Sequence, residues 1–79
     1  MQITRYGLSL KLDCDSDAFE EDRAAEIARI LRGMADRIER GSGDYCAQIN
    51  SGGTVEGWLW DLNGNNAGTW AAKPRKVRV

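Results

Sequence analysis

The sequence predicts an α+β fold in which one amphipathic helix packs on a small antiparallel sheet, in the order β-α-β-β-β. Three observations predict this fold: a two-residue alternation near the start, a long apolar stripe at helical spacing, and an Asn-Gly turn between two strand-like segments. A chain of 79 residues has room for one hydrophobic core. We therefore expect a single compact domain over residues 1–79.

The first strand is predicted from Thr4 to Leu12, where apolar and polar residues alternate strictly. This period gives a strand one buried face and one face in water. The segment that follows, residues 13–17, is rich in the residue types that cap helices. Asp17 and Glu20 have the spacing of a capping box, so the helix is expected to start near Asp17.

The helix is predicted to carry one buried stripe, because its apolar residues recur every three or four positions. The stripe consists of Phe19, Ala24, Ile27, Leu31, Met34 and Ile38, flanked by Ala28, Ile30 and Ala35. Charged residues, Glu26 among them, are placed on the remaining surface. The pairs spaced to interact are Glu26 with Arg29 and Asp36 with Arg40. Gly41, followed by Ser42 and Gly43, is expected to end the helix.

Three further strands are predicted over residues 45–50, 54–62 and 67–72. Asn63 and Gly64 join the last two in a tight hairpin, because both residue types tolerate the positive φ angles that primed turns require. Pro74 is expected to close the final strand, which leaves residues 74–79 as a solvated tail.

The hairpin carries apolar side chains on both faces, and one small helix cannot cover both. One face holds Trp58, Trp60 and Leu62, with Ala67, Thr69 and Ala71 across the turn. The other face holds Val55, Leu59, Trp70 and Ala72. Alternation alone does not decide which face packs on the helix, and a bulge at the turn would shift the assignment. Trp70, beside Leu59, is the best core candidate.

Trp58 and Trp60, beside Glu56, form the predicted partner-binding surface. Their neighbours across the hairpin are small, as expected of an outward face, and tryptophan is enriched among the residues that dominate binding energy. A homodimer through the same face is an alternative, because a core this small gains stability from self-association.

Six carboxylates lie within residues 13–22, with no basic residue among them. Helix caps and dipole partners are the ordinary interpretation. A calcium loop is disfavoured, because its glycine and closing glutamate positions hold Ala18 and Ala24. The remaining interpretation is an acidic patch that docks on a basic protein surface. Its predicted contacts are Asp13, Asp15, Glu20 and Glu21.

The charge balance, 11 basic against 12 acidic residues, fits neither a strongly basic nucleic-acid-binding chain nor a uniformly acidic mimic. The basic residues near the end are Lys73, Arg75, Lys76 and Arg78. They are interpreted as a solvated terminus. The alternative is weak, salt-sensitive binding of single-stranded nucleic acid, with Trp58 and Trp60 as stacking platforms.

Catalysis, metals and cofactors are disfavoured by the residues present. The chain has no histidine and no glycine-rich phosphate loop, and Cys14 and Cys46 lack a neighbouring base, so we expect free thiols and no enzyme activity. The opening residues do not resemble a secretory signal, and no apolar run is long enough to span a membrane. The chain is therefore predicted to be cytoplasmic, with no membrane partner.

Residues 25–38 (AEIARILRGMADRI) and 61–65 (DLNGN), the latter followed by Gly68-Thr69-Trp70, resemble small uncharacterised proteins of phages, prophages and mobile elements. Such proteins look like compact strand-helix-strand units, and their gene neighbourhood includes anti-CRISPR inhibitors. The resemblance implies stoichiometric binding to a Cas effector that blocks guide-complex assembly, target DNA entry or nuclease recruitment. The segment from Asp44 to Gly57 departs from the shorter pattern of that group, and no functional residue is carried over.

The leading functional hypothesis is a non-enzymatic phage or mobile-element inhibitor of a host defence complex, with an anti-CRISPR protein as the first expectation. It is motivated by the two-faced hairpin, the acidic helix entry and the missing catalytic chemistry. The alternative hypothesis is a small nucleic-acid-binding module that uses the basic tail and the exposed tryptophans.

Overall fold

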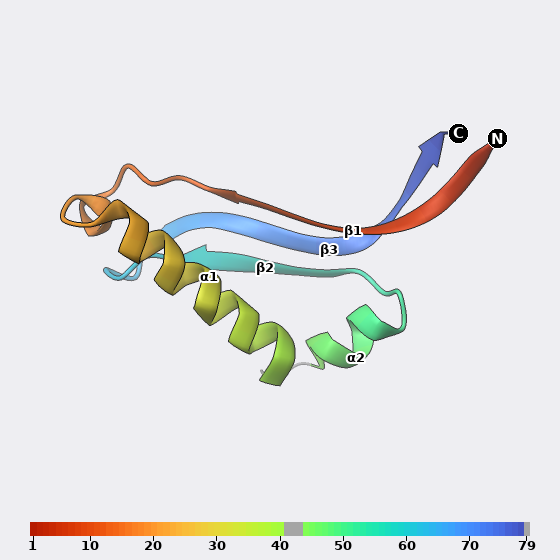
Figure 1. Cartoon of the computed structure of the whole chain (residues 1–79). Coiled ribbons are helices and arrows are strands. Elements are labelled where there is room, and N and C mark those ends of the chain that lie inside the picture. Colours follow the sequence, from red (N-terminus) through yellow and green to blue (C-terminus); the bar gives the residue numbers. More distant parts are fainter. Residues whose placement is uncertain (41–43, 79) are drawn as a thin grey trace.

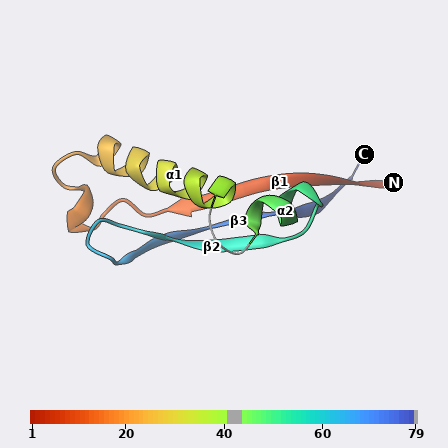
Figure 2. The ribbon, with the colours of Figure 1, turned by 90° about the horizontal axis from the view of Figure 1, so that it is seen from below.

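The computed structural model describes residues 1–40 and 44–78 (Figure 1). Strands β1 (Gln2–Leu12), β2 (Val55–Trp60) and β3 (Asn66–Arg78) form one antiparallel sheet in the order β1-β3-β2. Helix α1 (Arg23–Arg40) lies along one face of this sheet, and the 3-10 turn η1 (Asp17–Phe19) and the short helix α2 (Tyr45–Asn50) lie at its two ends (Figures 1 and 2). The predicted α+β class, with one long helix on a small antiparallel sheet, is confirmed.

The core lies between α1 and the sheet face that carries Leu59 and Trp70. The buried apolar residues are Phe19, Ile30, Met34, Val55, Leu59, Ala67, Trp70 and Ala72. The indole of Trp70 lies over Gly57, where a Cβ would overlap it, and the ring of Tyr45 meets it edge-on at 5.7 Å. The prediction that Trp70 and Leu59 are core residues is confirmed, and the open question of which hairpin face packs on the helix is answered.

The register between β2 and β3 shifts between Leu59 and Trp60, which is a β-bulge. Leu59 pairs with Gly68 but Trp60 pairs with Asn66, so Ala67 is the extra residue. Ala67 is buried in the core, and the prediction that it shares a face with Trp58 is therefore wrong. Strict alternation fails at a bulge because two residues of one strand oppose one residue of the other.

Residues 45–50 form helix α2, so the predicted strand there is wrong. Tyr45 and Ile49, four residues apart, both pack against the core, and that spacing suits a helical turn and not a strand. The order along the chain therefore has helix α2 where the sequence predicted a second strand.

The start of the long helix also differs from the prediction. Asp17 opens only the turn η1, which places Phe19 in the core, and α1 begins at Arg23. The Asp22 carboxylate accepts a hydrogen bond from the Ala25 amide at 3.0 Å, so Asp22 is the capping residue instead of Asp17. Helix α1 ends at Arg40; the predicted stop at residues 41–43 lies outside the described residues.

The buried stripe of α1 agrees only in part with the predicted one, since Ile27 and Ile38 do pack against the core. Its buried residues are Glu26, Ile30 and Met34, whereas Ala24 and Leu31 are exposed. Asp36 and Arg40 do form the expected ion pair at 2.8 Å. The burial of Glu26 is not evident from the helix sequence alone, because the Leu62 amide that it binds lies in a distant segment.

The predicted tail is part of the sheet. Residues 74–78 continue β3 and pair with the first residues of β1; residue 79 lies outside the described part of the chain. The Asp13 amide donates to the Ala67 carbonyl, which makes the odd-numbered residues of this ladder the hydrogen-bonded ones. Pro74 opposes Tyr6 at a non-hydrogen-bonded position, so its missing N–H costs the β1–β3 ladder nothing.

Candidate protein-docking surface

The outer face, defined as the sheet face opposite α1, carries two exposed tryptophans. Trp58 is 59% exposed and Trp60 is 45% exposed, although both belong to a strand whose other large apolar residues are buried. Thr69 lies opposite Trp58 on β3. The prediction that these two indoles face away from the core is confirmed, and the described chain leaves them uncovered.

A shallow groove of about 580 Å³ runs across the outer face beside Trp58. Each strand contributes side chains to it. They are Ser9 and Lys11 from β1, Glu56 and Trp58 from β2, and Thr69 and Ala71 from β3. The groove thus combines an aromatic wall, small side chains on its floor and one charge of each sign, an arrangement suited to a side chain of another protein.

The β1–β3 register gathers cations on the same face. Arg5 lies opposite Arg75, and Lys11 lies opposite Thr69. Lys73 and Arg75 alternate with Pro74 and Lys76, so they share this face while Lys76 and Arg78 take the opposite one. The Arg75 side chain lies against Gly7, 3.5 Å from where a Cβ would stand. The predicted basic tail is therefore divided between two faces of a strand.

The predicted acidic contacts lie elsewhere. Asp13, Asp15, Glu20 and Glu21 are exposed in the segment that joins β1 to α1, at the end of the sheet that also holds the β2–β3 turn (Figures 1 and 2). Among the predicted acidic contacts, only Glu56 lines the groove of the outer face. Within residues 1–40 and 44–78, no three acidic or cysteine side chains are close enough to hold a metal ion together.

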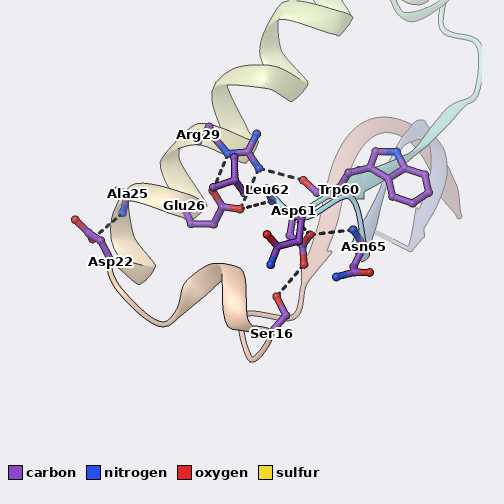
Figure 3. A network of polar contacts seen from close by, with 10 residues as sticks. Ser16, Asp22, Ala25, Glu26, Arg29, Trp60, Asp61, Leu62 and Asn65 are labelled. Atoms are coloured by element: carbon purple, nitrogen blue, oxygen red, sulfur yellow. Dashed lines mark hydrogen bonds and ion pairs between the residues drawn. The ribbon is translucent and has the colours of Figure 1, made fainter.

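A buried polar network holds β2 and its turn against α1 (Figure 3). Glu26, only 6% exposed, accepts hydrogen bonds from Arg29 at 2.6 Å and from the Leu62 amide at 2.8 Å. Arg29 also donates to the Trp60 carbonyl. Asp61, 4% exposed, accepts from the Ser16 hydroxyl and from the amides of two turn residues, Asn63 and Asn65.

Sequence reasoning placed Glu26 on the surface, and this is wrong. The spacing of Glu26, Ile30 and Met34, four residues apart, puts the three on one helix face and could have revealed the burial. Asp61 also had a usable signal, because an aspartate two residues before a turn amide commonly accepts its hydrogen bond. The ion pair of Glu26 with Arg29, expected from spacing, is confirmed.

Both carboxylates should make folding sensitive to acid. The hydrogen bond from Arg29 lowers the pKa of Glu26 below its ordinary 4.5, and the Asn65 amide, followed by Ser16, lowers the pKa of Asp61 below 3.8. A lowered pKa gives stability that is complete above the ordinary value and is lost as pH falls through the folded value. We expect the melting temperature to fall as pH is lowered below about 4.5.

Thermal melts followed by circular dichroism between neutral and acidic pH measure this effect. The Asp61→Asn variant, which cannot ionise, should show a shallower acid-side decline than the wild-type chain. If the melting temperatures of the two proteins decline in parallel, Asp61 does not contribute to the acid sensitivity.

Two further sequence predictions concern the thiols and the membrane. Cys14 is half-buried and Cys46 is exposed, and neither takes part in a disulfide. Among the described residues, no helix combines the length and the apolar character needed to cross a membrane.

The outer face thus presents two exposed indoles, a groove and a row of cations. Comparisons with models of protein families, with curated proteins and with solved structures find no significant match to this chain.

Proposed function

We propose that this chain is a non-enzymatic binding protein that inhibits its target by docking the outer face onto it, with Trp58 and Trp60 as anchors. The observation that carries the proposal is the exposure of both indoles, 59% and 45%, on the face that the helix does not cover. Large aromatic side chains supply much contact area at a small cost in conformational entropy, and they dominate many protein interfaces.

The backbone of β2 supports these anchors. Arg37 donates to the Trp58 carbonyl and Arg29 donates to the Trp60 carbonyl, so α1 holds the strand at both tryptophan positions. Rigid presentation lowers the entropy lost on binding, because the anchor positions are set before the partner arrives. A small sheet held in this way suits an inhibitor that acts by occupying a surface.

For the partner, we propose a host defence complex, with a CRISPR effector as the first target to test. The resemblance of residues 25–38, 61–65 and 68–70 to phage and mobile-element proteins supports this choice. Charge is distributed unevenly along the molecule, with exposed acids at residues 13–22 and cations on the outer face at Arg5, Lys73 and Arg75. Such a distribution orients a partner during encounter.

The test is titration of the purified chain into purified effector complexes of several CRISPR types, followed by gel filtration and a target-cleavage assay. We expect a stable complex and cleavage that falls to a floor at a fixed molar ratio, because a docking inhibitor acts stoichiometrically. Absence of any complex across the panel would remove the CRISPR target. Cleavage lost at far below one inhibitor per effector would contradict a stoichiometric mechanism.

Single-stranded nucleic acid is a second candidate, favoured by one observation. The register places four cations on the same face as the two exposed indoles, namely Arg5, Lys11, Lys73 and Arg75. Stacking platforms bordered by phosphate-binding cations are the usual means of binding single strands.

A matched pair of variants tests this candidate. Lys73→Ala with Arg75→Ala should weaken oligonucleotide binding about tenfold at low salt and reduce the salt slope by about 1.4, because two phosphate contacts to a single strand are lost. Lys76→Ala with Arg78→Ala removes the same charges from the other face of β3 and should change binding much less. Fluorescence anisotropy with a labelled single strand measures both; equal effects, or no binding at low salt, would exclude the outer face as a nucleic-acid site.

A further inference from the structure

The two edges of the sheet are protected very differently. Trp58 and Trp60 are two residues apart, so their carbonyls point to the same edge of β2. Asp61 is odd-numbered, so its backbone groups point to the opposite edge, and its amide donates across the hairpin to the Asn65 carbonyl. The tryptophan carbonyls therefore point away from β3, and there Arg37 and Arg29 of α1 bind them. Helix α1 thus blocks the β2 edge against another strand.

The β1 edge has no comparable cover. The odd-numbered residues of β1 bond to β3, as the Asp13 amide shows, so the even-numbered ones direct their N–H and C=O groups outward. They include Thr4, Tyr6, Leu8 and Leu10. Among the described residues, no hydrogen bond reaches the outward backbone groups of these four, although the carbonyl of Leu12, at the end of the edge, accepts one from the Cys14 thiol. The edge contains no proline, which is one of the devices that protect edge strands.

The side chains of this edge are largely apolar and partly exposed, although the Tyr6 hydroxyl donates to the Gly53 carbonyl. Tyr6, Leu8 and Leu10 are on the α1 side of the sheet, because they oppose Pro74, Ala72 and Trp70 of β3. Helix α1 packs toward β2, at the far side of the sheet order, and leaves Tyr6 40%, Leu8 55% and Leu10 41% exposed. An edge strand with unpaired backbone groups and exposed apolar side chains is a template for pairing with another strand.

We propose that β1 pairs antiparallel with β1 of a second copy of this chain, about a twofold axis at Ser9. Outward residues must oppose outward residues, so the axis must pass through a residue position and not between two residues. Centring on Leu8 would place Arg5 opposite Lys11, and like charges directly opposite are destabilising. Centring on Ser9 places Arg5 opposite Asp13 of the second copy, twice by symmetry.

The same register pairs the apolar residues. Leu8 opposes Leu10 of the second copy, and Tyr6 opposes Leu12. The result is one continuous sheet in the order β2-β3-β1-β1-β3-β2, with the two outer faces on the same side because the twofold axis is perpendicular to the sheet. The dimer joins two copies of the tryptophan and cation surface into one, but its existence does not depend on the proposed function.

Cysteine crosslinking tests the register directly. At the axis, Ser9 of each copy forms a non-hydrogen-bonded pair, whose Cα atoms are about 4.5 Å apart, within disulfide range. A Ser9→Cys variant, with Cys14 and Cys46 changed to serine, should form a covalent dimer on mild oxidation. Gly7→Cys in the same background should crosslink far less; the reverse preference would overturn the register.

Sedimentation equilibrium tests the interface. Leu8→Pro removes an outward N–H without touching the ladder to β3, and should weaken dimerisation about tenfold or more because the loss occurs twice. Arg5→Glu should weaken it as well, and adding Asp13→Lys should restore it. A wild-type chain that stays monomeric up to its solubility limit, or a dimer indifferent to all three variants, would overturn the proposal.

Discussion

A Phe19→Ala variant should lose about 3–5 kcal/mol of its free energy of unfolding, because the ring is fully enclosed and its removal leaves a cavity. Phe19 is 1% exposed and belongs to the core although it lies in a single 3-10 turn outside α1. A domain of this size has a total stability of only about 5 kcal/mol. The variant is therefore expected to be largely unfolded at room temperature.

Urea unfolding followed by far-UV circular dichroism measures this loss. Leu62→Ala is the matched control, because Leu62 is 69% exposed and its truncation should change stability by less than about 0.5 kcal/mol. A Phe19→Ala protein with the wild-type urea midpoint would show that η1 does not anchor the segment between β1 and α1.

Replacing Trp58 and Trp60 together by alanine should weaken binding to the partner by more than about 2 kcal/mol, which corresponds to about 30-fold in Kd. The fold should survive, because both side chains are largely exposed and the carbonyls that Arg37 and Arg29 bind belong to the backbone. Calorimetry with the effector complex identified by titration gives the affinity, and thermal melting gives the stability.

Leu31→Ala serves as the control for this double variant. Leu31 is 37% exposed on α1, on the other side of the sheet from the tryptophans, and its truncation should leave affinity unchanged. If the control and the double variant bind equally well, the docking surface lies elsewhere on the molecule.

The parts of the fold that the sequence predicted correctly are those where side-chain period decides the structure. The alternation from Thr4 to Leu12 does form strand β1, but the face that it predicts to be buried is left exposed at Tyr6, Leu8 and Leu10. A turn does lie at Asn63-Gly64, with a φ of +83° at Gly64, but Asn63 has no positive φ, so the predicted primed turn is wrong. The division of the hairpin into a core face and an outer face also follows from alternation up to the bulge at Leu59 and Trp60.

The parts that the sequence did not predict depend on contacts between distant segments. Residues 45–50 alternate weakly and also fit a helical turn, and only the core contacts of Tyr45 and Ile49 favour the helix. Pro74 indicates the end of a strand unless its nitrogen faces away from the ladder. Only the pairing of Pro74 with Tyr6 of β1 shows that its nitrogen does so here. The cations gathered on the outer face were missed as well, because only the pairing of β1 with β3 brings them together.

Collisional quenching of tryptophan fluorescence by acrylamide, with and without the effector complex, tests the docking surface most directly. The free chain should show two accessible indoles and one protected indole, Trp70, which is 2% exposed. Binding to the effector should protect the two accessible indoles from acrylamide. In a Trp58→Phe, Trp60→Phe variant, only the fluorescence of the protected Trp70 should remain. Uniform protection in the free chain, or accessible indoles that stay accessible in the complex, would contradict the account.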